Sequence, residues 1–329
     1  ADLSAYDLYL QARALYQRRA NLEEAEALLG KAVERDPNFT DAWALRAATW
    51  SIFKEYVVTD LSYDEIAKLV DAYADRALAL DPGNARAIAA RANFRLNASS
   101  SLAHRYDLGG IFDDLTRAIE LDPRDSSAIN WLGMLHALVG ESDKALNIFA
   151  ACEMVDPYFG PCAENHYDLL TVKGRYDEAF AQYQKVLSKG INVGAWANFS
   201  MLARLDQKAS FMQASNDPEW LPGWRRHGDI YDAFKNPKAD HGALIDELRE
   251  FTRAHPRREV NPNSIFLIPI GDFDAKPYPV HVWGEDYARY RRSPQFKAYI
   301  RDSGVYDYWK QRGFPPQCKA RGNDDFECE

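Results

Sequence analysis

The stretch Ala118-Ile-Glu-Leu-Asp-Pro123 decides the fold, because close versions of the same phrase end three other segments of the chain. The corresponding stretches are Ala32-Val-Glu-Arg-Asp-Pro37, Ala77-Leu-Ala-Leu-Asp-Pro82 and Cys152-Glu-Met-Val-Asp-Pro157. Their prolines lie 45, 41 and 34 residues apart. Recurrence at this period is typical of repeat arrays, in which each unit buries its apolar face by stacking on its neighbours. We therefore predict a solenoid in the first half of the chain.

The shortest interval, 34 residues, is the period of the tetratricopeptide repeat (TPR), a unit of two helices joined by a turn. We predict an all-α fold with a TPR superhelix of about five helix-turn-helix units over residues 1–190. The longer intervals predict insertions in units two and three, near residues 55–63 and 97–104. Residues 191–329 lose the period and become rich in Trp, Tyr, Phe and Pro. This part is predicted to be an irregular helical extension and cap packed on the array.

The composition is that of a folded chain, with 47% hydrophobic and 27% charged residues. A formal net charge of -9 argues against a nucleic-acid surface, which needs clustered Lys and Arg. No apolar run is long enough to span a bilayer, and the first residues lack the basic-then-apolar order of a signal peptide. We expect no contact of this segment with nucleic acid, and take Ala1 as a processed or trimmed end.

The four cysteines fall into two pairs with equal spacing, Cys152 with Cys162 and Cys318 with Cys328. An even number and a repeated spacing predict two disulfides and hence an oxidising compartment. Free thiols in a cytosolic chain are the alternative. Zinc sites use shorter Cys spacings, so no metal site is predicted.

Motifs for catalysis or cofactor binding are missing from the sequence, including nucleophile elbows, zinc-binding His pairs and Gly-rich phosphate loops. We therefore predict no catalytic residue and no cofactor. The dense aromatic residues of the second half are best interpreted as packing, with a carbohydrate platform or a homodimer interface as alternatives. A third functional hypothesis is an enzyme whose site lies in this half, around His281 and Trp283.

Three features together resemble a known class of domain: the opening Ala5-Tyr-Asp-Leu-Tyr-Leu-Gln-Ala-Arg13, the Asp-Pro repeats, and the ending Ser293-Pro-Gln-Phe-Lys-Ala-Tyr-Ile-Arg-Asp-Ser-Gly-Val-Tyr-Asp-Tyr-Trp309 with a late Cys. The chain resembles the extracytoplasmic TPR region of bacterial membrane-anchored regulators. In that family a winged-helix transcription domain, or in relatives an adenylate cyclase domain, precedes one transmembrane helix. The resemblance implies a periplasmic location, possibly as the soluble part of a single-pass inner-membrane protein. Membrane contact would come only through an N-terminal anchor.

The resemblance also implies that the first helix of each pair lines a concave face and binds a protein or peptide partner. The residues predicted to point into this groove are Asp41, Arg86, Asn93, Asn130, Met134, Glu164 and Asp168. Arginine and asparagine side chains can hydrogen-bond a peptide backbone or a carboxylate. A solvated polar face without a partner is the alternative. The leading functional prediction is a non-enzymatic sensor or interaction domain, and the second is a periplasmic scaffold of an envelope complex without a signalling role.

Overall fold

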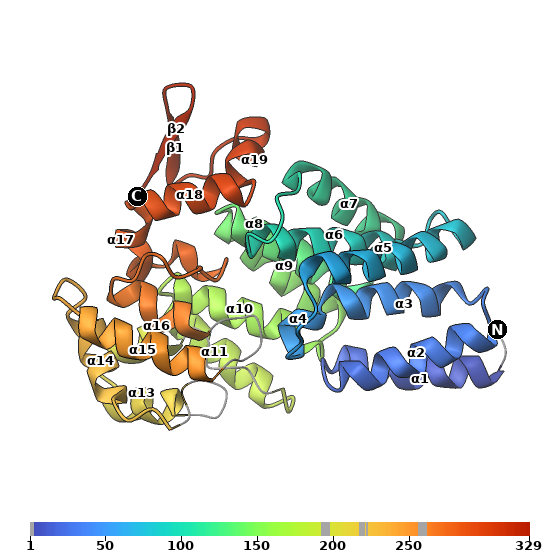
Figure 1. Ribbon diagram of the computed structural model, residues 1–329, viewed down its shortest axis with the longest axis horizontal. Coiled ribbons are helices and arrows are strands. Elements are labelled where there is room, and N and C mark those ends of the chain that lie inside the picture. The colour runs from blue at the N-terminus through green and yellow to red at the C-terminus, as the bar shows by residue number, and fades with distance from the viewer. Residues whose placement is uncertain (1–2, 192–197, 217–220, 222, 256–261) are drawn as a thin grey trace.

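The computed structural model describes residues 3–191, 198–216, 221, 223–255 and 262–329, and it shows an array of helices continued by an extension (Figure 1). Within these residues the first eleven helices form five packed pairs, with α4 inserted in the second pair. The pairs are α1 (Leu3–Gln17) with α2 (Leu22–Arg35), α3 (Thr40–Ser51) with α5 (Tyr63–Leu80), α6 (Ala85–Ser100) with α7 (Leu108–Leu121), α8 (Ser126–Leu138) with α9 (Ser142–Val155), and α10 (Gly160–Val172) with α11 (Tyr176–Leu187). The array predicted from the period is present.

Each Asp-Pro step forms the same local turn at the end of the second helix of a pair. The aspartate Oδ1 accepts a hydrogen bond from the backbone N–H two residues later, at 3.0–3.1 Å in all four turns. The aspartates are Asp36, Asp81, Asp122 and Asp156. Proline cannot continue the helix, and the aspartate satisfies a backbone donor that the helix no longer uses. The Asp-Pro phrase recurs because it ends one unit and directs the chain into the first helix of the next.

The two insertions take different forms. In unit two the chain adds a short helix, α4 (Phe53–Tyr56), and a loop that ends at the capping box of Ser62 and Glu65. In unit three α6 itself is long, with 16 residues, and a loop follows from Ser101 to the N-cap Asp107. These loops overlap the stretches 55–63 and 97–104, in which the longer intervals predict insertions.

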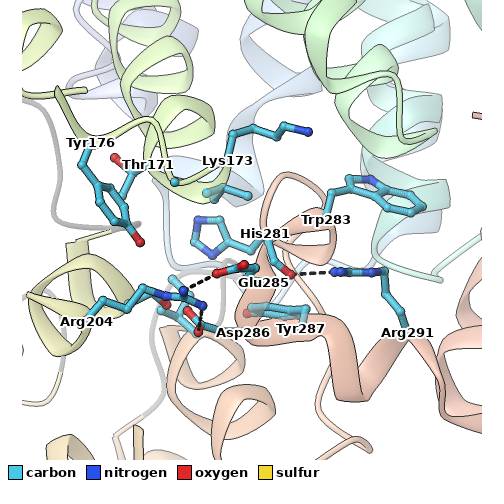
Figure 2. A pocket seen from close by; sticks show the side chains of 15 residues that line it. Thr171, Lys173, Tyr176, Arg204, His281, Trp283, Glu285, Asp286, Tyr287 and Arg291 are labelled. Carbon is cyan, nitrogen blue, oxygen red and sulfur yellow. Dashed lines mark hydrogen bonds and ion pairs between the residues drawn. The ribbon is translucent and has the colours of Figure 1, made fainter. Parts of the chain in front are cut away.

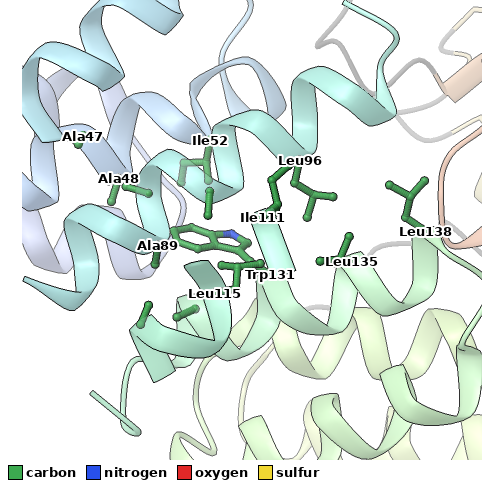
Figure 3. Packing of buried hydrophobic residues seen from close by; sticks show 14 of the residues in the cluster. Ala47, Ala48, Ile52, Ala89, Leu96, Ile111, Leu115, Trp131, Leu135 and Leu138 are labelled. Carbon is green, nitrogen blue, oxygen red and sulfur yellow. The ribbon is translucent and has the colours of Figure 1, made fainter. Parts of the chain in front are cut away.

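The core of the array is built from small and aliphatic side chains that let the helices cross closely. Trp131 on α8 packs among alanines and leucines of α3, α6 and α7 (Figure 3). Gly133 lies two residues further along α8, and a Cβ there would come within 2.4 Å of the Phe149 ring on α9. A larger residue at position 133 would force these two helices apart.

The extension is also mainly helical. Its helices are α12 (Asn198–Arg204), α13 (Lys208–Ser215), α14 (His227–Lys235), α15 (Gly242–Ala254), α16 (Pro262–Ile270), α17 (Ala288–Arg291), α18 (Pro294–Asp302) and α19 (Val305–Arg312), with 3-10 turns at His281–Trp283 and Glu285–Tyr287. The apolar segment 264–270 belongs to helix α16. An antiparallel hairpin of β1 (Cys318–Arg321) and β2 (Asp325–Cys328) follows α19, and the sequence pattern did not indicate it.

Polar atoms of the extension bind the end of α8. The indole of Trp283 donates to the carbonyl of Ala137 at 2.7 Å, and that of Trp309 donates to Val139 at 2.9 Å. Gln317 donates to the carbonyl of Gly140 at 2.8 Å. The last carbonyls of a helix have no partner within the helix, so these side chains satisfy groups that would otherwise be buried without a hydrogen bond. Two tryptophans and a glutamine of the extension therefore supply donors to carbonyls at the end of α8 and just after it.

Two observations bear on the compartment. Both expected disulfides are present, Cys152–Cys162 between α9 and α10 and Cys318–Cys328 across the hairpin, with Cα–Cα distances of 6.1 and 4.1 Å. Among the described helices, none combines the length and the apolar character needed to cross a bilayer. The disulfides fit an oxidising compartment.

Candidate functional site

Several residues predicted to line an open concave face are bonded inside the array. Arg86 forms an ion pair with Asp125 at 3.4 Å and donates a hydrogen bond to the Tyr9 hydroxyl at 3.3 Å. Burial opposes the charge of Arg86, but the Asp125 carboxylate outweighs it and raises the pKa of the guanidinium. Asn93 is 1% exposed and donates to the Ser51 hydroxyl at 3.2 Å. These side chains join different units of the array.

The remaining predicted residues differ in their exposure. Asn130 is buried and accepts a hydrogen bond from the Asn165 amide at 2.9 Å. Asp168 is also buried, Met134 and Glu164 are half-buried, and Asp41 is exposed in the first turn of α3. Their contact with a partner stays a prediction.

Residues that are distant in the sequence also meet on the inner face of the array. The array curves so tightly that the end of α1 touches the start of α8. The Tyr16 hydroxyl donates to the Ser127 hydroxyl at 3.2 Å, and Arg19 donates to the same oxygen at 3.2 Å. These contacts cross the inner face of the first units beside a pocket of about 380 Å³, which Arg86 also lines. A larger groove lies elsewhere.

Such a groove of about 720 Å³ lies between the inner helices and the extension. We call it the array–extension groove. From the array it is lined by Glu55, Tyr63, Asn97, Ser100, Ser101 and Met134, and from the extension by Arg249, Thr252, Arg253, Leu267, Asp272, Asp274, Ala275, Lys276, Pro277, Tyr278 and Pro279. Of the residues predicted as partner-binding, Met134 lies in this lining.

One wall of the groove is the stretch Lys276-Pro-Tyr-Pro279, which has no helix or strand. Lys276 donates from Nζ to the carbonyl of Ser101 at 3.0 Å and so ties this wall to the end of α6. The opposite side carries Arg249, whose Nε bonds Asp272 Oδ2 at 2.7 Å. Burial, followed by the Asp168 carboxylate, raises the pKa of Tyr278 well above its usual value, so its hydroxyl stays protonated. The groove offers donors, acceptors and apolar surface together.

A second pocket of about 380 Å³ lies where α10, α12 and the two 3-10 turns meet, and we call it the His281 pocket (Figure 2). Arg204 on α12 forms ion pairs with Glu285 and with Asp286, the latter at 2.7 Å. His281 is 3% exposed, and burial lowers its pKa to about 3, so the imidazole is neutral. Its ring packs edge-on against Tyr278, with centroids 5.3 Å apart. The two sites thus share a wall.

Sequence reasoning missed the extension side of the groove. Arg249, Asp272 and Lys276 carry no periodic signal, since they lie outside the repeats. The Pro-Tyr-Pro279 step was the available signal, because alternating prolines favour an extended backbone. His281 and Trp283, named only for the enzyme hypothesis, both line the His281 pocket.

The chain is similar in structure to several solved proteins. No protein-family model matches the chain, and no curated protein matches it. Among solved structures, the chain is similar to pilF of Pseudomonas aeruginosa, with 22% identity, a TM-score of 0.48, and coverage of 72% of this chain and 99% of that one. It is also similar to TTC0263, a thermophilic TPR protein of Thermus thermophilus, with 19% identity, a TM-score of 0.44, and coverage of 56% and 90%.

A third similar structure is YrrB, described as a TPR protein with an unusual peptide-binding site, with 22% identity, a TM-score of 0.32, and coverage of 55% and 84%. The class of this chain rests on its own helix pairs and Asp-Pro turns. It is an all-α helical repeat of the TPR type with an aromatic-rich helical region at its C-terminal side.

Proposed function

We propose that the chain is a non-enzymatic protein- or peptide-binding domain and that its partner binds in the array–extension groove. Solenoids of this type use extended concave surfaces to bind partners. The observation that carries the proposal is the groove of about 720 Å³ between the inner helices and the extension. Its volume lies in the range of about 300–1,000 Å³ that is typical of ligand sites.

The lining suits a short stretch of extended peptide. A peptide backbone needs alternating donors and acceptors. The groove presents the side-chain oxygens of Asn97, Ser100 and Thr252 as acceptors, since their N–H and O–H groups donate within the chain, together with charged groups of both signs. Tyr63 and Met134 add apolar surface for a side chain. Recognition of this kind needs no catalytic group.

Peptide selection on the immobilised domain tests this proposal. We expect a consensus peptide to bind the unchanged protein and to lose at least about tenfold in affinity to Ser100→Trp, because an indole on α6 fills the groove. Ser210→Trp is the matched control, since Ser210 is an exposed serine on α13 that does not line the groove. Equal binding to both variants would place the partner elsewhere.

We further propose that the domain is the periplasmic sensor or interaction part of a membrane-anchored regulator. Two disulfides and the resemblance of both ends of the chain support this role. Reading the gene upstream of Ala1 tests it. A membrane helix preceded by a winged-helix or cyclase domain is expected, whereas a secretion signal alone would favour the periplasmic scaffold.

A further inference from the structure

We propose that the His281 pocket binds a small anion that carries a carboxylate or phosphate group. This inference is independent of partner binding in the array–extension groove. It rests on the charges that line the pocket, on one buried nitrogen without a partner among the described residues, and on the pocket volume of about 380 Å³.

The charge balance of the pocket favours an anion. Its two carboxylates, Glu285 and Asp286, are both paired with Arg204. Lys173 and Arg291 line the same pocket, and neither forms an ion pair with a carboxylate side chain within the described residues. With Lys173, Arg204 and Arg291 against two carboxylates, the lining carries a net charge of +1, which an anion can neutralise.

Arg291 is held in place before any ligand arrives. Its Nη1 donates to the carbonyls of Val282 and Gly284 at 2.8 and 2.6 Å, and its Nε donates to the main-chain oxygen of Glu329 at 2.6 Å. These bonds fix the Arg291 guanidinium beside the 3-10 turn that carries His281. Burial lowers the pKa of Arg291 to about 10, so it still carries its charge at neutral pH. A guanidinium whose charge is not matched by a carboxylate side chain is suited to an oxyanion.

His281 supplies the second observation. Its Nε2 is buried and has no hydrogen-bond partner among the described residues, although buried polar atoms nearly always have one. The neutral ring carries one N–H, and the Nε2–H tautomer can donate that hydrogen bond to an anion without adding charge. A ligand oxygen would satisfy a nitrogen that the protein leaves unpaired.

The walls indicate an anion with a small organic body. Val172, Ile265 and Trp283 contribute apolar surface beside the polar groups. Inorganic phosphate would use the charges alone, whereas phenyl phosphate would also bury its ring. We expect both probes to bind, with phenyl phosphate bound more tightly because it removes apolar surface from water.

Calorimetric titration of the whole chain with these two probes, at constant ionic strength, tests the site. Lys173→Met removes a charge-assisted hydrogen bond to the ligand, so it should weaken phenyl phosphate binding at least about tenfold. Lys31→Met is the matched control: Lys31 is an exposed lysine on α2, outside the pocket. Equal losses in the two variants, or no binding of either probe, would overturn the proposal.

Nuclear magnetic resonance of ¹⁵N-histidine-labelled protein gives a readout that survives if a variant is unstable. Phosphate should shift the ring nitrogens of His281 while leaving unchanged those of His241, which is half-buried and does not line the pocket. His281→Phe keeps the aromatic packing against Tyr278 and should lose phosphate binding. Unchanged His281 signals at saturating phosphate, or tighter binding of phenethylamine than of phenyl phosphate, would contradict an anion site.

Discussion

The repeat array and the extension solve the same problem of burying backbone and side chains in different ways. In the array, the first four helix pairs end in the same Asp-Pro turn, and alanines and glycine allow close crossings. Among the described residues of the extension no unit repeats. Large aromatic side chains such as Trp283 and Trp309 bury their rings there, while their N–H groups bond the carbonyls that end α8. The extension thus completes the array and supplies one wall of the array–extension groove.

The largest expected effect comes from breaking the contact between the two regions. Trp309→Ala should lower the free energy of unfolding by about 3–5 kcal/mol, because a fully buried indole is removed and a cavity is left. Trp309→Phe keeps most of the packing but leaves the Val139 carbonyl without its donor, which costs about 1–3 kcal/mol. Denaturant titration followed by circular dichroism measures both. A loss below about 1 kcal/mol for Trp309→Ala would mean that the extension does not support the array.

Each region has one disulfide, so removing each in turn compares how much a disulfide stabilises the two regions. The double variant Cys152→Ser with Cys162→Ser should lose about 2–4 kcal/mol, since it releases a constraint on the unfolded chain and puts hydroxyls in a buried site. The matched pair Cys318→Ser with Cys328→Ser lies at the less buried hairpin and should lose less. Intact mass after alkylation without reductant should show no modified cysteine. Four alkylated cysteines would contradict both bridges.

A buried carboxylate in the array makes its stability depend on pH. Glu153 accepts hydrogen bonds from His166 at 2.6 Å and Lys185 at 2.7 Å. Burial alone would raise the pKa of the Glu153 carboxyl, but these bonds outweigh it and lower the pKa from 4.5 to about 2. Because the folded pKa lies below the unfolded value, the stabilisation is complete above about pH 4.5 and is lost as the pH falls through about 2.

The variant Glu153→Gln tests this dependence. It should lower the free energy of unfolding by about 2 kcal/mol at pH 6, and the difference from the unchanged protein should shrink as the pH falls toward 2. Glu178→Gln is the control on α11, since its pair with Arg175 is exposed and screened by water, so its loss should change stability far less. A difference that stays constant with pH would refute the ionic role of Glu153.

The smallest effects concern helix caps, which both regions use. Ser62 caps α5 in the array and Ser293 caps α18 in the extension, each through its hydroxyl. Replacing either by alanine should cost about 1 kcal/mol. The loss should be larger at Ser293, which is buried, because water cannot replace the hydroxyl there. Equal losses at both positions would show that burial of the cap is unimportant.

Local patterns allowed the array to be predicted, because the information lies within each unit. The Asp-Pro turns fixed the period, the uneven spacing located α4 and the long α6, and the cysteine spacing indicated both pairs. The site was harder to predict. Arg86 and Asn93 are bonded to residues of other units, and Tyr16 reaches Ser127 across several units. Such contacts follow from the curvature of the whole array, which no single unit encodes.

We propose that the partner binds between the array and the extension. Site-specific photo-crosslinking in the native cell tests it most directly, with the crosslinker placed at Ser100 on α6, at Thr252 on α15, or at exposed Ser210 on α13. The two groove positions should give the same adduct and Ser210 should give none. An adduct at Ser210 together with none at Ser100 and Thr252 would contradict the claim.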